Sequence, residues 1–431
     1  MAEPLRRGYA VAATDDGHQA SGIDASWAVG HPEKITDFAY RALKVTTDNA
    51  KAIIEAFEST GPDLSYFFGC SDGGREALME AQRFPDDFNG IIAGSPANAW
   101  THLFTGFVYN ELALTKTPDS ALTNADVNLL TAAVLAQCAG HDGGLASDAF
   151  LNNPPACNFN PETLLCTGHQ TSSCLSQAKV TAIKKIYAGP AGVFPGYEPG
   201  AESSPANWPL WITGNGMPTM GLQELFGNTF FADMVFPGTG WTPTSTSIIE
   251  DVRAADANER VSAINSTDPD LTPFVGYGGK MIQYVGWADS AIAPQNDINY
   301  YRSVTHVLGG LSTTQQSYRL FMVPGMAHCS GGPGPNAFGN GVNGPNPNDP
   351  SQDLISALEQ WVELGIAPEK IIATKYVNDN PAEGVAFQRP LCAFPEVSEF
   401  SGSGDPTQAV NWKCVRPKGR GHGHGRGSGG S

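Results

Sequence analysis

The sequence is poor in positive charge and has no long apolar runs. Its 431 residues include 25 Lys and Arg against 43 Asp and Glu, a formal net charge of −18. Proteins that bind nucleic acid are usually basic, and the single basic cluster here lies in the glycine-rich tail after Cys414. We therefore expect no nucleic-acid partner. No run of about 18 apolar residues occurs, so we also expect no membrane-spanning helix and no membrane partner.

The eight cysteines lack the spacing of a metal site. None forms a C-x-x-C pair, and none is spaced with histidines as in zinc-binding domains. An even number of cysteines in an acidic chain instead predicts disulfides and a secreted, extracellular or periplasmic protein. The segment Met1–Arg7 lacks the apolar stretch of a signal peptide. We therefore expect a trimmed form of a secreted protein, without its leader.

The sequence does contain enough apolar material for a large core. Hydrophobic residues make up 41% of the chain, and 49 Gly and 32 Pro point to many turns and long loops. This length accommodates one large domain with an insertion, or two to three domains. The sequence predicts no particular oligomeric state.

A G-x-S-x-G motif at Gly69, Ser71 and Gly73 organises the first part of the chain. An extended aromatic run ends at Phe68, and a helical pattern begins near Glu76. Strand, sharp turn and helix in this order are the context of a nucleophile elbow, in which a serine hydroxyl projects above the edge of a sheet. A glycine-rich turn capped by a serine is the structural alternative, and the motif alone leaves both open.

Strands and helices alternate around this motif. Residues 8–14 and 90–94 are predicted to be buried strands, and residues 33–57 have helical apolar spacing. Residues 1–100 therefore form the first part of an α/β core with a mostly parallel sheet flanked by helices. Residues 266–415 form the second part, with predicted strands at 280–286, 319–323 and 371–377 and helices at 297–307 and 354–364.

The intervening residues, 101–265, have a different character. One clear helix begins near Asn124 or Asp126, and the rest holds aromatics, Thr/Asn/Pro-rich stretches and four cysteines. We predict a large inserted, loop-rich lid domain. Residues 416–431 are mostly Gly, Arg, His and Ser, and we expect this tail to be disordered, with only weak metal binding by His422 and His424.

Two residues downstream of Ser71 are placed to serve as its acid and its base, because each directly follows a predicted strand. A serine hydroxyl needs a base that is oriented by an acid, and α/β-hydrolases supply them in the order nucleophile, acid, histidine. Asp289 follows the strand that ends at Gly286, and His328 follows the strand that ends at Val323. We therefore predict that Ser71, Asp289 and His328 are the catalytic residues.

Two cysteines lie directly beside these residues. Cys70 precedes Ser71, and Cys329 follows His328. A disulfide between them would tie the turn of the nucleophile to the loop of the base and restrict their separation. Two independent buried thiols are the alternative, which suits a cysteine-rich chain less well.

With these residues in place, the chain resembles the tannase and feruloyl esterase family, which includes mono(2-hydroxyethyl) terephthalate hydrolases. The hallmark of that family is a Cys-Ser … Asp … His-Cys arrangement, matched here by Cys70-Ser71, Asp289 and His328-Cys329. Further matching segments, at 8–15, 285–289, 323–332 and 389–392, extend the resemblance over nearly the whole chain. It implies an α/β-hydrolase core with a lid, and an oxyanion-binding backbone N–H at Asp72.

The resemblance also implies four disulfides, whereas eight cysteines alone leave many pairings open. The implied pairs are Cys70–Cys329, Cys138–Cys157, Cys166–Cys174 and Cys392–Cys414. Family members have a glycine-rich loop, upstream of the segment at which this chain begins, that supplies a second oxyanion donor. Its loss would lower turnover by about 10²–10³-fold unless another group replaces it.

The family holds a structural calcium ion in a lid loop that follows a cysteine. The matching loop, residues 138–148, keeps Asp142, but Ala139 and Ala146 stand where carboxylates are usual. The resemblance therefore leaves two expectations open. Either the loop keeps Ca²⁺ through Asp142, Gly144 and Asp148, or its disulfide alone orders it. No cofactor is expected for the chemistry.

Together these features predict a serine esterase that hydrolyses feruloyl or other hydroxycinnamoyl, galloyl or terephthaloyl esters through an acyl-enzyme. The substrate would be a small aromatic ester, or one derived from plant cell walls or polyesters. A serine peptidase on the same fold, or a binding protein with weakened or lost catalysis, are the alternatives. Lid aromatics are expected to hold the acyl group, and an arginine would be needed for an anionic substrate. The candidates are Phe230, Phe231, Trp241 and Trp211 for the ring, and Arg253 or Arg260 for the anion.

Overall fold

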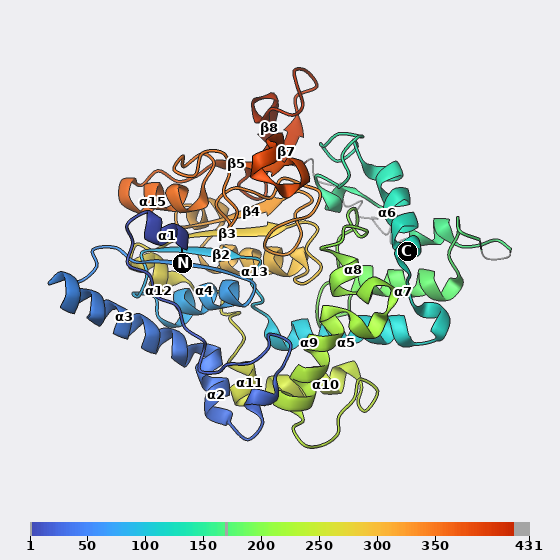
Figure 1. Ribbon diagram of the computed structural model, residues 1–431, viewed down its shortest axis with the longest axis horizontal. Helices are drawn as coiled ribbons and strands as arrows, with labels where there is room; N and C mark the ends of the chain where they lie inside the picture. The colour runs from blue at the N-terminus through green and yellow to red at the C-terminus, as the bar shows by residue number, and fades with distance from the viewer. Residues whose placement is uncertain (1, 169–170, 418–431) are drawn as a thin grey trace, which may run out of the picture.

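A parallel sheet lies at the centre of the protein in the computed structural model, which describes residues 2–168 and 171–417 (Figure 1). Its four strands lie side by side in chain order. Every neighbouring pair is parallel, so each connection crosses over through helical segments, as the alternating sequence pattern predicts. The strands are β1 (Tyr66–Cys70), β2 (Gly90–Gly94), β3 (Lys280–Gly286) and β4 (Tyr318–Val323).

Helices cover both faces of this sheet because successive strand residues point to opposite sides. In β3, Met281 and Val285 pack in one apolar cluster with residues of α4 and α13. Ile282 and Tyr284 pack in another cluster with α15. The covering helices are α4 (Asp72–Arg83), α13 (Pro294–Val307) and α15 (Leu354–Leu364).

The lid is inserted between β2 and β3, which are hydrogen-bonded neighbours in the sheet. Ser266 N–H donates to the carbonyl of Asn98 at 2.9 Å, so the lid starts and ends side by side. The lid contains more helix than the sequence predicts. Helix α5 (Trp100–Thr115) is buried on nearly all sides and therefore shows no amphipathic period. It packs against α7 (Gln177–Ala188), α9 (Leu222–Thr229) and α10 (Ile248–Ala257), and α6 (Asn124–Cys138) belongs to the same apolar cluster.

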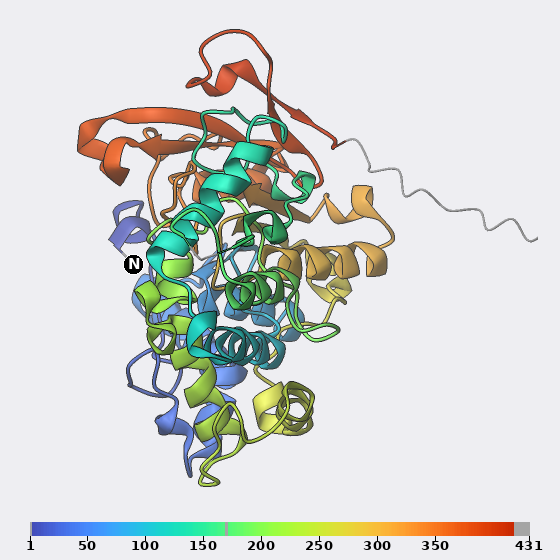
Figure 2. The same ribbon diagram turned by 90° about the vertical axis from the view of Figure 1, so that its right-hand side faces the viewer.

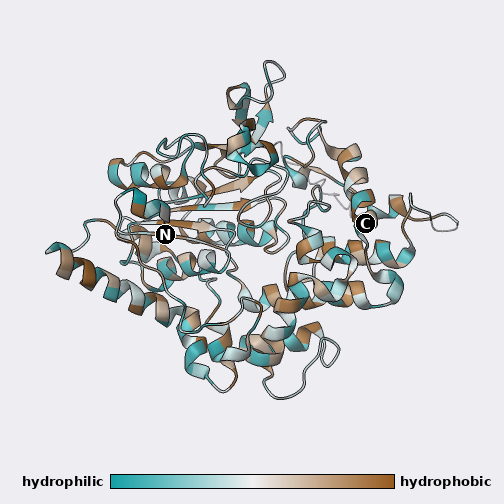
Figure 3. Cartoon of the chain, in the orientation of Figure 1, coloured by the Kyte–Doolittle hydropathy of each residue, from teal (hydrophilic) through white to brown (hydrophobic). Residues whose placement is uncertain are grey.

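The segment 8–14 is not a strand, contrary to the sequence-based prediction. Within the described residues no strand pairs with β1 on the side away from β2, so an extended segment there has no ladder to join. The same side of the molecule exposes apolar side chains of α3 (Ala42–Glu58), which projects from the body (Figure 1) and is brown at its free end in Figure 3. Phe57 is 84% exposed and Ile53 is 68% exposed.

Two antiparallel hairpins complete the chain and gather along one side of the molecule (Figure 2). They pair β5 (Lys370–Tyr376) with β6 (Val385–Cys392), and β7 (Val397–Phe400) with β8 (Trp412–Val415). Of the predicted tail, residues 418–431, including His422 and His424, lie outside the described residues. None of the described helices combines the length and the apolar character needed to cross a bilayer.

Candidate active site

Ser71 occupies the turn between β1 and α4 in a backbone conformation that residues other than glycine rarely adopt. Its φ is 66° and its ψ is −118°. Hydrogen bonds hold this turn, because the Ser71 N–H donates to the Gly94 carbonyl at 2.9 Å and the Ser71 carbonyl accepts from Ala97 N–H at 3.1 Å. Such a turn lifts the hydroxyl out of the sheet next to a helix N-terminus, which is the geometry of a nucleophile elbow.

Glycine is required at two positions of this turn. A Cβ on Gly69 would lie 2.1 Å from the carbonyl oxygen of Gly73. A Cβ on Gly74 would lie 2.3 Å from the carbonyl oxygen of Gly94. By contrast, a Cβ on Gly73 would meet only Glu76 Oε2, at 3.9 Å. The tight approach of helix to sheet therefore depends on Gly74, and the last glycine of the sequence motif is sterically free.

We expect Gly74→Ala to abolish folding and Gly73→Ala to be tolerated or stabilising. Gly74→Ala pushes backbone atoms of α4 and β2 apart. Gly73→Ala replaces a flexible residue in a helix, which raises the free energy of unfolding by about 0.5–1 kcal/mol. Thermal melting followed by circular dichroism measures both. A Gly74→Ala variant that melts at the wild-type temperature would contradict the steric argument.

His328 and Asp289 form the pair expected of a base and its orienting acid. A carboxylate accepts only, so the His328 Nδ1–H donates to Asp289 Oδ2, at 2.8 Å. Asp289 Oδ1 accepts from the backbone N–H groups of Ala291 and Ile292, at 2.8 and 2.9 Å. These bonds fix a carboxylate that is 2% exposed, and they select the tautomer in which Nε2 carries the lone pair.

A disulfide joins the serine turn to the histidine loop. Cys70 and Cys329, the neighbours of Ser71 and His328, are bonded with their Cα atoms 6.0 Å apart. His328 Nε2 is buried and has no hydrogen-bond partner among the described residues. The ring of Trp211 packs edge to face with the imidazole, at 5.1 Å between centroids. The arrangement thus leaves Nε2 free to accept a proton.

The other three disulfides are also those implied by the resemblance. They join Cys138 to Cys157, Cys166 to Cys174 and Cys392 to Cys414. The first two lie within the lid, and the third links β6 to β8. No free cysteine remains.

Ser71 opens into a cavity of about 610 Å³ that we call the aromatic cavity. Its wall combines a loop before the sheet, residues 15–27, with α5, α9 and the adjoining π-helical turn η8 (Phe230–Val235). Aromatic rings dominate the lining, so the cavity suits a flat apolar group. The rings belong to Trp27, Phe38, Trp100, Phe104, Phe107, Trp211, Phe226 and Phe230.

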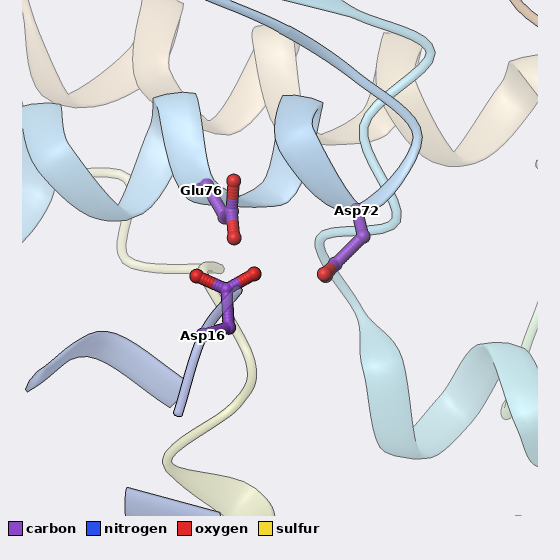
Figure 4. Close-up of side chains that lie close together, drawn as sticks. All are labelled: Asp16, Asp72 and Glu76. Carbon is purple, nitrogen blue, oxygen red and sulfur yellow. The ribbon is translucent and has the colours of Figure 1, made fainter. Parts of the chain in front are cut away.

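Three carboxyl groups meet beside the serine turn, and Figure 4 shows them pointing toward one another. Asp72 and Glu76 come from α4, and Asp16 comes from the loop before the sheet. Burial, reinforced by the charge of Asp72, raises the pKa of Glu76 to about 10, and its carboxyl hydrogen-bonds Asp16. Arg75, which is fully buried, pairs with Asp72 and donates to the carbonyls of Phe38 and Ala39 at 3.0 and 2.9 Å.

The oxyanion donor predicted from the sequence is the backbone N–H of Asp72. Asp72 is the first residue of α4, so its N–H has no acceptor within the helix. The contribution of an upstream loop to this site stays a prediction.

Of the aromatic residues predicted to hold the substrate, Phe230 and Trp211 line the cavity, whereas Phe231 and Trp241 do not. The latter two stack on each other at 5.0 Å within the lid core, and Phe231 has no exposed surface. Arg253 and Arg260 are exposed and lie outside the cavity. Phe230 and Phe231 differ because adjacent residues of the helical turn η8 face different sides, whereas Trp241 lies outside that turn.

Sequence reasoning missed the ring contribution of α5 and of the loop before the sheet. Trp100, Phe104 and Phe107 recur at i, i+4 and i+7 and so lie along one face of α5. That spacing was visible in the sequence. The part played by Trp27 was not, since only the folded loop brings it to the cavity.

The residues present in the candidate calcium loop do not fit a calcium ion. Asp142 is 6% exposed, and its two oxygens already accept from the backbone N–H groups of Gly144, Asn152 and Asn153. Asp148 forms an ion pair with the buried Arg389, at 3.4 Å. Calcium prefers six or more oxygen ligands, and a guanidinium next to the second carboxylate disfavours any cation.

We therefore expect a chelator to leave the stability unchanged. A ligand that binds only the folded state raises the melting temperature of the protein, so removing a tightly held ion would lower that temperature. For this protein we expect EDTA to shift the melting temperature by less than about 1 °C. Millimolar calcium added back should have as little effect. A rise of several degrees with calcium would show that the loop binds it.

Comparisons with known proteins show the family of this chain. A family model described as "Tannase and feruloyl esterase" matches residues 1–415. An uncharacterized esterase of Xanthomonas campestris pv. campestris is 42% identical, over 96% of this chain and 76% of its own length. A probable feruloyl esterase B-1 of Neosartorya fischeri is 32% identical, over 95% of this chain and 76% of its own.

Solved structures give the same picture. Feruloyl esterase B from Aspergillus oryzae superposes with a TM-score of 0.85 at 29% identity, covering 96% of this chain and 80% of that one. Tannin acyl hydrolase from Aspergillus niger superposes with a TM-score of 0.69 at 23% identity, covering 91% and 73%. The second likeness supports the fold alone.

Proposed function

Because the chain belongs to the tannase and feruloyl esterase family, and is thus a carboxylic ester hydrolase, we propose that it cleaves aromatic esters through Ser71, His328 and Asp289. One observation carries the proposal. The disulfide Cys70–Cys329 joins the strained Ser71 turn to a histidine that is hydrogen-bonded to Asp289 and whose Nε2 has no partner among the described residues.

In the proposed reaction, Ser71 Oγ attacks the ester carbonyl carbon while His328 Nε2 takes its proton. The carbonyl oxygen becomes negative and accepts from the Asp72 N–H at the start of α4, where the helix dipole also favours negative charge. His328 then returns the proton to the departing alcohol, leaving an acyl-enzyme. A water molecule, deprotonated by the same nitrogen, releases the acid and restores Ser71.

The aromatic cavity supports an aromatic acyl group as substrate. Its volume of about 610 Å³ and its ring-lined wall suit a feruloyl, galloyl or terephthaloyl unit, from plant cell walls or polyesters. We further propose that the protein acts outside the cell or in the periplasm. Four disulfides support this, because such bonds persist in oxidising compartments.

The test combines active-site labelling with a substrate panel. A fluorophosphonate probe is expected to label Ser71, identified by mass spectrometry of the modified peptide. Methyl ferulate, methyl gallate and monomethyl terephthalate are then compared with peptide substrates in one preparation. Hydrolysis of aromatic esters without peptide cleavage supports the proposal. Peptide cleavage at a higher rate would favour a peptidase, and absence of both labelling and turnover a binding protein.

A further inference from the structure

The charged side chains that line the aromatic cavity are all acidic. They are Asp15, Asp16, Asp24 and Asp72, and no lysine or arginine among the described residues lines it. His18, whose ring stacks on Trp27 at 3.9 Å between centroids, carries a charge only when protonated. An anion inside the cavity would therefore meet carboxylates without a permanent counter-charge.

The nearest guanidinium does not change this balance. Arg75 has no exposed surface, and its donors are used by Asp72 and by the carbonyls of Phe38 and Ala39. It neutralises Asp72 and is sealed from the cavity. Asp16 and Glu76 share a hydrogen bond, and the raised pKa of Glu76, about 10, keeps a proton on the pair at neutral pH, so the two carboxyl groups are not both charged.

Asp24 remains a full negative charge at the cavity wall. Its Oδ1 accepts from the Ser26 N–H at 2.9 Å, and this hydrogen bonding lowers the pKa of the carboxyl. Asp15 is exposed and accepts from the Gly17 N–H at 3.1 Å. Asp233 in η8 lies close to Asp24. Burial raises the pKa of Asp233, and the negative charge of Asp24 raises it further. Asp15 and Asp24 thus place negative charge on the part of the cavity wall formed by the loop before the sheet.

We infer that the aromatic cavity selects esters by charge, accepting neutral and cationic substrates and rejecting those that carry a second carboxylate. This inference rests on the proposed function. A carboxylate would lose its hydration without gaining a cationic partner, whereas an ammonium group would meet aromatic faces and the Asp24 carboxylate. Among the aromatic acyl groups considered, neutral feruloyl and galloyl esters therefore suit the cavity, and the anionic half-ester of terephthalate does not.

Three methyl esters that differ at one position test this inference. Methyl 4-carbamoylbenzoate is neutral, monomethyl terephthalate is its anionic counterpart, and methyl 4-(aminomethyl)benzoate is cationic. We expect kcat/KM for the anion to be about tenfold below that of the neutral amide, and that of the cation to equal or exceed it. Salt screens electrostatic interactions but does not change the electronic effect of the ring substituent on the ester. The difference in kcat/KM between the anion and the neutral amide should therefore shrink in 0.5 M NaCl.

Asp24→Asn and a matched control distinguish the effect of the Asp24 carboxylate on substrate selection from the effect of the overall surface charge. Asparagine keeps the acceptor for Ser26 N–H but removes the charge, so the gap between anion and amide should narrow about threefold. Asp270 forms the same kind of turn, accepting from Thr272 N–H at 3.0 Å, and lies outside the cavity. Asp270→Asn should leave the gap unchanged.

The outcomes distinguish this inference from the proposed function. If the anion and the amide react equally well at both salt concentrations, the charge selection is wrong while the esterase proposal stands. If no ester is hydrolysed, the esterase proposal fails, and binding then decides the inference. Quenching of the cavity tryptophans in Ser71→Ala by the same three compounds should still rank the anion weakest, and equal affinities would overturn the selection.

Discussion

Replacing Ser71 with alanine is expected to lower kcat/KM for methyl ferulate by about 10⁴–10⁶-fold. The change removes the atom that forms the acyl-enzyme, and water has no comparable position from which to attack. The strained turn around Ser71 is held by backbone bonds to Gly94 and Ala97, so the fold should survive the substitution. Steady-state kinetics together with a melting curve measures both effects.

An exposed serine on a helix provides the control for that experiment. Ser303 lies on α13, and its hydroxyl donates to the carbonyl of Asn299 in the same helix. Ser303→Ala should retain wild-type turnover. If Ser71→Ala kept more than about one hundredth of the wild-type rate, the covalent mechanism would have to be abandoned.

Asp289→Asn is expected to lower kcat by about 10³–10⁴-fold with little loss of stability. The amide oxygen of asparagine can still accept from Ala291 and Ile292, but its NH₂ group would face His328 Nδ1. The imidazole then places its lone pair on Nδ1 and its proton on Nε2, so the nitrogen nearest the reaction can no longer take a proton from Ser71. Initial rates measured over a pH series report this defect.

Asp297 is a matched control for the loss of that carboxylate. It is fully buried, and its Oδ1 accepts from Gln283 Nε2 at 2.7 Å. Burial, with the charge of Asp289 adding to it, raises the pKa of Asp297 well above its usual range. Asp297→Asn keeps an oxygen that can accept from Gln283 Nε2, and Asp297 has no hydrogen bond to His328, so the change should cost less than about tenfold in kcat. Equal losses in the two variants would remove the special role given to Asp289.

The sequence was most informative where local pattern and chain order coincide. The strands β1 to β4 and the helices α4, α13 and α15 lie where apolar periodicity predicts them, because each buries a regular face against the sheet. Ser71, Asp289 and His328 were predicted from the G-x-S-x-G motif, from their order along the chain and from their places after strands, since parallel strands present their carboxyl ends at one edge. Their catalytic roles stay predictions. The pair Cys70–Cys329 was suggested by the places of these cysteines beside Ser71 and His328, whereas the other three disulfides needed the family resemblance, because spacing does not determine pairing.

The predictions that differ from the structure concern properties set by distant neighbours. Residues 8–14 have the composition of a strand, but a strand also needs a partner, and the described residues provide none. Phe231 and Trp241 looked like substrate contacts by composition, yet their rings fill the lid core. The acidic lining of the cavity combines loop residues before the sheet with α4, a grouping that no single stretch of sequence reveals.

The closeness of the two ends of the lid has a consequence for engineering this protein. Asn98 and Ser266 are joined by a backbone hydrogen bond, and the strands on either side, β2 and β3, are adjacent. The intervening residues therefore form a cassette that another sequence of different length can replace without stretching the sheet. Exchanging this segment would replace most of the aromatic residues that line the cavity, whereas Ser71, Asp289 and His328 would stay in place on the α/β core.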